Sequence, residues 1–184
     1  MYQYGDPKYK NVRDSGVPIK EIGYPHDMNY GGIYSPGVTF FRNNISKFYT
    51  LRDKTFKCDV ITVAALCFNG KSHYAGIDEL AFQAEDGGFT PEGKEIMLNK
   101  IRTIFRMGVK NKKDALVLGA FGCGAYELPI PEVVRLFHIV INEPEFVNKF
   151  RILVFAILEK NAARSGEHGK FSEFYRVFGT YKPS

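Results

Sequence analysis

The sequence predicts an α/β protein with a mixed, mostly parallel sheet. Three segments rich in β-branched and other apolar residues, 57–65, 115–118 and 150–158, are typical of strands, and each precedes a segment with helical spacing of apolar residues. A glycine-rich turn joins the second strand to its helix, as at ligand sites of such folds. With 184 residues, of which 45% are hydrophobic, the chain is long enough for one well-buried core.

The N-terminal part of the chain gives the weakest signals. Residues 1–30 contain Gly, Pro, Asp, Asn and Tyr without a sustained period, so we expect an irregular arm before one folded domain, 31–184. The β-prone segment 32–41 contains Pro36, which predicts an edge or bulged strand. The closely spaced apolar residues of 57–65 predict a strand buried on both faces, inside the sheet.

A helix start is clear at Thr90 and Pro91, because threonine caps helices and proline suits the first helical position. An amphipathic helix is predicted to about residue 107. Its apolar face carries Met97, Ile101, Ile104 and Phe105. Its polar residues, which we expect mostly elsewhere, are Lys94, Asn99, Lys100 and Arg106.

The C-terminal half continues the alternation. The short strand 115–118 leads through the glycine turn to a helix from Pro131, which is apolar almost all round and should be deeply packed. The most hydrophobic segment, 150–158, predicts another central strand. A polar loop, 159–169, then precedes a short last helix, 171–178.

The glycine-rich turn indicates an anion site. Gly119, Gly122 and Gly124 allow positive φ, so backbone N–H groups can face a ligand, and the helix that follows adds partial positive charge. A tight connection without a ligand is the alternative. The pattern is not a P-loop, since Ala125 and Tyr126 stand where Lys and Ser or Thr would follow. It is not a dinucleotide fingerprint either, because the spacing G-x-G-x-x-G is absent.

Charge and cysteine content narrow the function classes. The net charge of +5 suits an anionic ligand, but the basic residues are scattered and no nucleic-acid motif accompanies them, so a specific nucleic-acid partner is not expected. Cys58, Cys67 and Cys123 form an odd set without metal or disulfide spacing, which fits a reducing cytoplasm. We expect Cys123 to pack rather than act as a nucleophile. No metal, cofactor, signal peptide or membrane span is expected.

Five ordered blocks carry a resemblance to a known family: 33–42, 60–65, 116–126, 131–134 and 150–157. They resemble the macrodomain of the microbial-type poly(ADP-ribose) glycohydrolase family. The resemblance implies a three-layer α/β/α macrodomain-like fold, in which the glycine loop wraps the diphosphate of ADP-ribose.

The same resemblance implies a set of ligand-binding residues. The loop residues are Gly119, Ala120, Phe121, Gly122, Cys123, Gly124, Ala125 and Tyr126. Of these, Ala125 and Tyr126 should lie near the distal ribose. The end of the neighbouring strand, Val63, Ala64 and Ala65, lines the ribose side of the cleft. Phe174 borders the adenine, although aromatic residues at helical spacing are more often core.

One departure from the family pattern decides the expected activity. In the family, a three-glycine stretch followed by Gln-Glu-Glu precedes the Tyr-Ser-Pro block and supplies the acid for glycosidic cleavage. Here Gly31 and Gly32 are a pair with no Gln-Glu-Glu after them, and the weakly similar 83–86 lies on the wrong side of two strands. We therefore expect binding of ADP-ribose or an ADP-ribose-containing molecule without hydrolysis.

Two alternatives and one open question accompany this expectation. An ADP-ribosyl hydrolase would need an acid from elsewhere, with Glu85, Asp86 and Glu127 as candidates. A protein-interaction scaffold would use the glycines only for turning. Self-association is left open, because a strand without its neighbours invites association.

Overall fold

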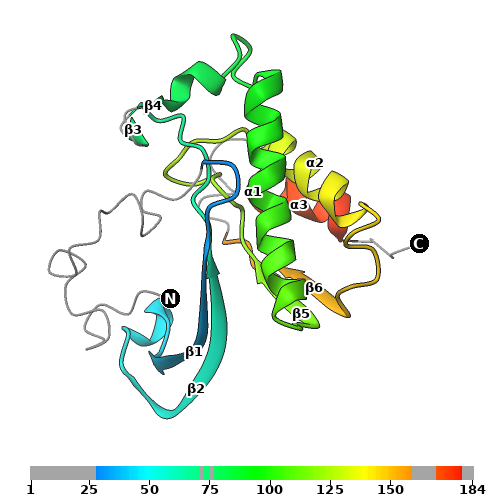
Figure 1. Ribbon diagram of the computed structural model, residues 1–184. Coiled ribbons are helices and arrows are strands. Elements are labelled where there is room, and N and C mark those ends of the chain that lie inside the picture. The colour runs from blue at the N-terminus through cyan, green and yellow to red at the C-terminus, as the bar shows by residue number, and fades with distance from the viewer. Residues whose placement is uncertain (1–27, 71–72, 75–76, 159–168, 180–184) are drawn as a thin grey trace, which may run out of the picture.

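The structure is a computed structural model that describes residues 28–70, 73–74, 77–158 and 169–179 (Figure 1). The predicted arm, 1–30, and the polar loop, 159–169, lie almost entirely outside these residues. The elements in chain order are β1 (Ile33–Arg42), the 3₁₀ turn η3 (Ile45–Lys47), β2 (Leu51–Thr62), β3 (His73–Tyr74), β4 (Ile77–Asp78), the 3₁₀ turn η4 (Glu79–Phe82), α1 (Pro91–Lys110), β5 (Ala115–Leu118), α2 (Ile130–Ile141), β6 (Ile152–Phe155) and α3 (Lys170–Phe178).

Strands β1 and β2 form a long antiparallel hairpin that extends away from the helices (Figure 1). The pairing shifts between Ser35 and Val38, around Pro36 and Gly37, where Gly37 has a φ of +63°. The prediction of a bulged strand is therefore confirmed. The turn η3 closes the far end of the hairpin.

The prediction that 57–65 is a strand buried on both faces is wrong. Residues 51–58 of β2 are exposed, and burial begins only after the strand, at residues 65–68. Within the described part of the chain, β2 pairs with β1 alone. The apolar spacing that suggested burial needs sheet neighbours and helices on both faces, and most of β2 has neither here.

Strands β5 and β6 are parallel, with Ala115 opposite Ile152 and Leu118 opposite Phe155. Alternation along β5 buries Leu116 and Leu118, whereas Val117 is 74% exposed. The helices thus cover one face of this pair. The segment 150–158, expected to be a central strand, forms a four-residue strand that pairs with β5 alone in the described part of the chain, and its exposed and half-buried residues alternate.

Helix α1 begins as predicted and runs three residues further than residue 107. Thr90 Oγ1 accepts a hydrogen bond from the Gly93 backbone at 3.1 Å. Its apolar side buries Met97, Ile101 and Phe105 completely.

Two of the four polar residues expected mostly outside the apolar face of α1 are buried, contrary to expectation. Asn99 and Lys100 are only 7% and 3% exposed. Asn99 accepts a hydrogen bond from Arg102 at 2.9 Å, and Lys100 lies close enough to the carboxylate of Glu79 to interact electrostatically. A buried polar group is tolerated when such partners surround it, and helical periodicity gives no sign of them.

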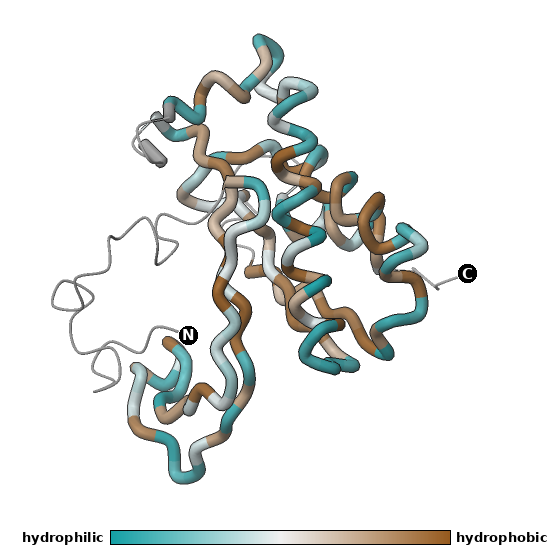
Figure 2. Tube along the Cα trace, in the orientation of Figure 1, coloured by the Kyte–Doolittle hydropathy of each residue, from teal (hydrophilic) through white to brown (hydrophobic). Residues whose placement is uncertain are grey.

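Helix α2 forms the centre of the helical layer, between α1 and α3 (Figure 1). Its predicted deep packing is confirmed: Val133, Val134, Leu136, Phe137, Val140 and Ile141 are buried. Figure 2 shows this apolar helix beside the more polar surface of α1. The Phe137 ring lies 5.2 Å from Phe155 and 6.3 Å from Phe174 between centroids, so α2 joins β6 to α3. No helix in the described part of the chain has the length and apolarity needed to cross a membrane.

The cap of α1 gives a first test. We predict that Thr90→Ala lowers the free energy of unfolding by about 1 kcal/mol, because the Gly93 N–H loses its acceptor. Urea denaturation measures this change. Thr90→Ser keeps the acceptor and should restore most of the stability; equal losses in both variants would contradict a capping role.

Candidate functional site

The glycine loop leaves the carboxyl end of β5 and folds back on itself. Cys123 N donates to Ala120 O at 3.0 Å, and Leu128 N donates to Gly122 O at 3.2 Å. Gly122 has a φ of +74°, and a Cβ atom there would lie 2.2 Å from Leu128 Cδ1 and 2.9 Å from Ala65 Cβ. Gly122 therefore meets the expected need for glycine through both conformation and close approach.

The other two glycines differ from this expectation. Neither Gly119 nor Gly124 has a positive φ. A Cβ atom at either residue would meet nothing within 4 Å. Their backbone borders open space, where a ligand can approach the main chain.

The segment after β2, residues 65–69, lies against the glycine loop. Phe68 N donates to Tyr126 O at 2.8 Å, and Asn69 Nδ2 donates to Ala125 O at 2.5 Å. The structure thus brings together two of the segments that the sequence assigned to one site. The sequence did not predict the contact of Asn69, because a single asparagine in a loop gives no sign of a hydrogen bond to a residue as distant in sequence as Ala125.

Two helix N-termini contribute positive charge near the loop. Helix α2 follows the loop directly, and α3 begins at Lys170, whose charge acts on Cys123. Neither helix has a side-chain cap at its N-terminus. Apart from Pro131, which has no N–H, the first residues of both helices carry N–H groups that no N-cap side chain occupies, and each first turn also holds a glutamate, Glu132 or Glu173.

Cys123 is a packing residue of the loop. Its side chain is 5% exposed, and burial raises the pKa of the thiol to about 12, with the nearby Lys170 charge opposing the rise. The thiol is therefore protonated at neutral pH and unsuited to nucleophilic attack. This agrees with the role expected from the sequence.

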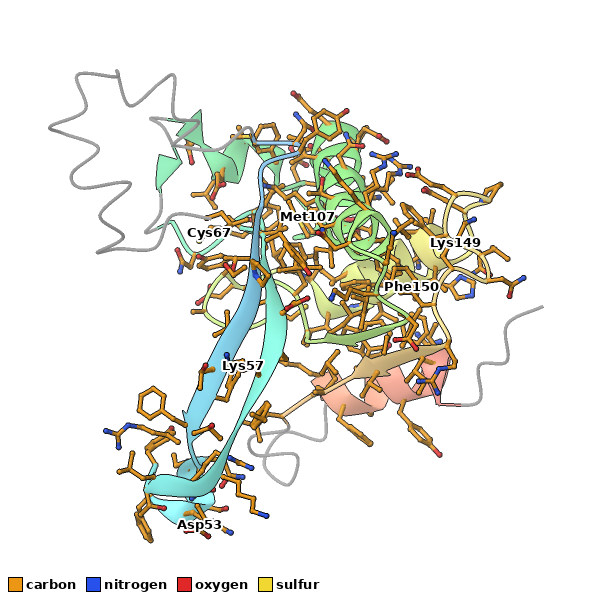
Figure 3. The ribbon with its side chains drawn as sticks, turned by 60° about the horizontal axis from the view of Figure 1, so that its bottom comes forward. Asp53, Lys57, Cys67, Met107, Lys149 and Phe150 are labelled. Carbon is orange, nitrogen blue, oxygen red and sulfur yellow. The ribbon has the colours of Figure 1, made fainter. Side chains whose placement is uncertain are left out.

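A groove of about 740 Å³ extends from the glycine loop between β2 and β5. Four of the expected site residues line it, namely Val63, Gly119, Ala120 and Phe121. Ile104 of α1 and Phe137 of α2 also line it, and Lys57 lies at its hairpin end. Figure 3 shows Lys57 on the hairpin, between Asp53 near the far end and Cys67 in the body.

Asp59 is the centre of a polar cluster in this groove. It pairs with Lys113, accepts a hydrogen bond from the Tyr34 hydroxyl, and accepts another from the Gly37 backbone at 2.7 Å. These contacts, that of Lys113 first, hold the pKa of the carboxyl well below its usual range. The cluster ties both hairpin strands to the turn before β5. Sequence reasoning missed it because the three side chains come from distant segments.

The carboxylates considered as hydrolytic acids do not line the groove. Glu127 is exposed, with a φ of +58°, and Asp86 accepts a hydrogen bond from Gly88 N at 2.9 Å in the turn before α1. Glu79, which the sequence did not single out, is 3% exposed, and burial raises the pKa of its carboxyl. Among the described residues that line the groove, Asp59 is the only carboxylate.

A smaller pocket of about 160 Å³ lies between β6 and α3. Phe174 lines it but is only 2% exposed, which fits the core role considered for it. Phe171 and Tyr175 also line it, are each more than half exposed, and stack with ring centroids 5.7 Å apart.

Comparison with known proteins gives matches among solved structures only. No family model and no curated protein matches the chain. A poly(ADP-ribose) glycohydrolase from Deinococcus radiodurans in complex with ADP-ribose matches 84% of this chain with a TM-score of 0.62 and 24% identity. The enzyme from Thermomonospora curvata matches 84% with a TM-score of 0.61 and 21% identity.

These matches confirm the macrodomain-like α/β fold that the sequence resemblance implied. The chain spans about half the length of the matched structures, 56% of the Deinococcus chain and 50% of the Thermomonospora chain. At this level of identity the likeness establishes the fold alone.

The two classes of loop glycine give a matched test. We predict that Gly122→Ala lowers the free energy of unfolding by about 1–3 kcal/mol, because it combines a positive φ with a clash against Leu128. Gly124→Ala should change it by less than about 0.5 kcal/mol. Thermal and urea unfolding of both variants measure the difference; similar losses would contradict the assigned loop geometry.

The Asp59 cluster predicts a pH response of the hairpin. The folded-state pKa of Asp59 is lowered, so its contribution is present at neutral pH and is lost as pH falls below the unfolded value of about 3.9. Amide exchange in β1 and β2, corrected for intrinsic rates, should accelerate below this pH. Asp59→Asn should show fast hairpin exchange already at neutral pH. Unchanged exchange in the variant would show that the cluster does not hold the hairpin.

Proposed function

We propose that this protein binds ADP-ribose or an ADP-ribose-containing molecule at the glycine loop, as a reader, sensor or sequestering protein. The observation that carries the proposal is the open backbone at Gly119 and Gly124 beside two uncapped helix N-termini. Such an arrangement would suit a diphosphate, because open backbone N–H groups and helix N-termini both favour negative charge. The Deinococcus structure, which shares the fold, is a complex with ADP-ribose.

The ligand would extend along the loop in both directions. The diphosphate would lie at residues 119–124, the distal ribose near Ala125 and Tyr126, and the other ribose face near residues 63–65. The adenine would occupy the aromatic pocket that Phe174 lines, where the exposed rings of Phe171 and Tyr175 offer stacking surfaces.

We also propose that the bound molecule is not hydrolysed. A general acid must be protonated at working pH, which for a carboxyl group requires a raised pKa. The sole groove carboxylate among the described residues, Asp59, has a lowered pKa because Lys113 and Tyr34 stabilise its charged form. It is therefore poorly suited to protonate a leaving group.

We also propose a domain assignment and a cellular location. Residues 31–184 would form the ADP-ribose-binding domain, with 1–30 as an arm. The three cysteines of the described chain are free, which favours a reducing cytoplasm.

The binding claim is tested by calorimetric titration with ADP-ribose. We expect saturable binding to the natural sequence and its loss in Gly124→Val, since the new side chain would fill the open space beside the backbone. The thermal unfolding midpoint should stay close to the original value. No heat at millimolar ADP-ribose would reject the proposal, and unchanged binding in Gly124→Val would remove the loop from the site.

Hydrolysis is tested separately with an ADP-ribosylated protein as substrate. We expect no release of ADP-ribose over the background rate. Turnover would reject the non-hydrolytic function, and the triple variant Glu85→Ala, Asp86→Ala, Glu127→Ala would then show whether these carboxylates supply the acid.

A further inference from the structure

The far part of the β1–β2 hairpin carries an unusual concentration of exposed apolar side chains. We call residues 38–57 the hairpin surface. Its exposed large apolar residues are Phe40, Phe41, Ile45, Phe48, Tyr49, Leu51 and Phe56. Phe48 is the most exposed, at 88%. Figures 1 and 3 show that this surface projects beyond the helical body.

The same surface is strongly basic. Its five basic residues, Arg42, Lys47, Arg52, Lys54 and Lys57, are all exposed, and Asp53 is its single acidic residue. The hairpin surface therefore carries a net charge of +4 in a chain whose total is +5. Such a local excess attracts a polyanion.

Two arginine side chains of this surface lie over aromatic rings. The Arg42 guanidinium lies 5.5 Å from the centroid of Phe41, and that of Arg52 lies 4.9 Å from the centroid of Phe56. Phe40 and Phe56 stack across the two strands at 5.0 Å. Exposed rings beside arginines are the combination that binds nucleotide chains, because bases stack on rings while phosphates pair with cations.

The hairpin surface is also continuous with the candidate site. The groove that begins at Gly119 of the glycine loop ends at Lys57 of the hairpin. The Asp59–Lys113 pair fixes the base of the hairpin beside this groove. A ligand longer than one ADP-ribose unit could therefore follow the groove from the loop to the basic rings.

We propose that the hairpin surface binds the continuing chain of an ADP-ribose polymer whose end unit occupies the glycine loop. The inference rests on the proposed function, since the loop must hold one unit. Each further unit supplies a diphosphate for the arginines and lysines and an adenine for the rings. A lipid surface would satisfy the apolar residues, but it would leave the groove that joins the hairpin to the loop without a role.

The test compares polymer with monomer binding. The hairpin variant is Arg42→Ser, Arg52→Ser, Lys54→Ser, and the charge-matched control is Lys110→Ser, Lys149→Ser, Arg151→Ser. We expect the hairpin variant to lose about tenfold or more in affinity for poly(ADP-ribose) and to depend less steeply on salt. Its affinity for ADP-ribose should be unchanged. The control should bind both ligands as the natural sequence does.

A second variant, Phe48→Ser with Tyr49→Ser, tests the rings without changing charge, and should weaken polymer binding alone. Equal polymer affinity of the natural sequence and the hairpin variant would overturn the inference but not the proposed binding of ADP-ribose. Absence of ADP-ribose binding would instead defeat the proposed function. Equally tight binding of oligodeoxyadenylate, or hairpin-dependent binding of phosphatidylserine vesicles, would reassign the surface to nucleic acid or to membranes.

Discussion

Gly122 has no room for a Cβ atom, and this close contact holds the glycine loop against the chain that follows β2. Ala65 and Leu128 fill the space beside it, while hydrogen bonds from Phe68 and Asn69 to the loop carbonyls complete the contact. Because those carbonyls face residues 65–69, the backbone at Gly124 remains open toward solvent. The anion site proposed for this protein depends on that division between a packed glycine and two accessible ones.

The charged groups around the glycine loop and the charged groups along the groove have different roles. Around the loop, the N-termini of α2 and α3 and the charge of Lys170 favour a negative ligand. Along the groove, Asp59 is kept charged by Lys113 and Tyr34 and is used to hold the hairpin in place. The chain shares its fold with the Deinococcus poly(ADP-ribose) glycohydrolase, and recognition without hydrolysis is what we propose for it.

Local signals predicted much of this structure. Thr90 and Pro91 marked the start of α1, and the glycines after residue 118 marked a tight turn between β5 and α2, because caps and turns depend on neighbouring residues. Non-local partners were not predictable: the exposure of β2 depends on its sheet neighbours, and the burial of Lys100 depends on Glu79. The Asp59–Lys113 pair joins segments far apart in sequence, so no spacing rule could reveal it.

The most direct measurement is a nuclear magnetic resonance titration with ADP-ribose that follows each backbone amide. Binding to the loop predicts saturable shifts that are largest at Gly119, Gly124 and Ala125, with smaller shifts at the start of α3. The amides of β3 and β4 should not move. Shifts that avoid the loop, or no shifts at saturating ligand, would contradict the diphosphate site on which the proposed function depends.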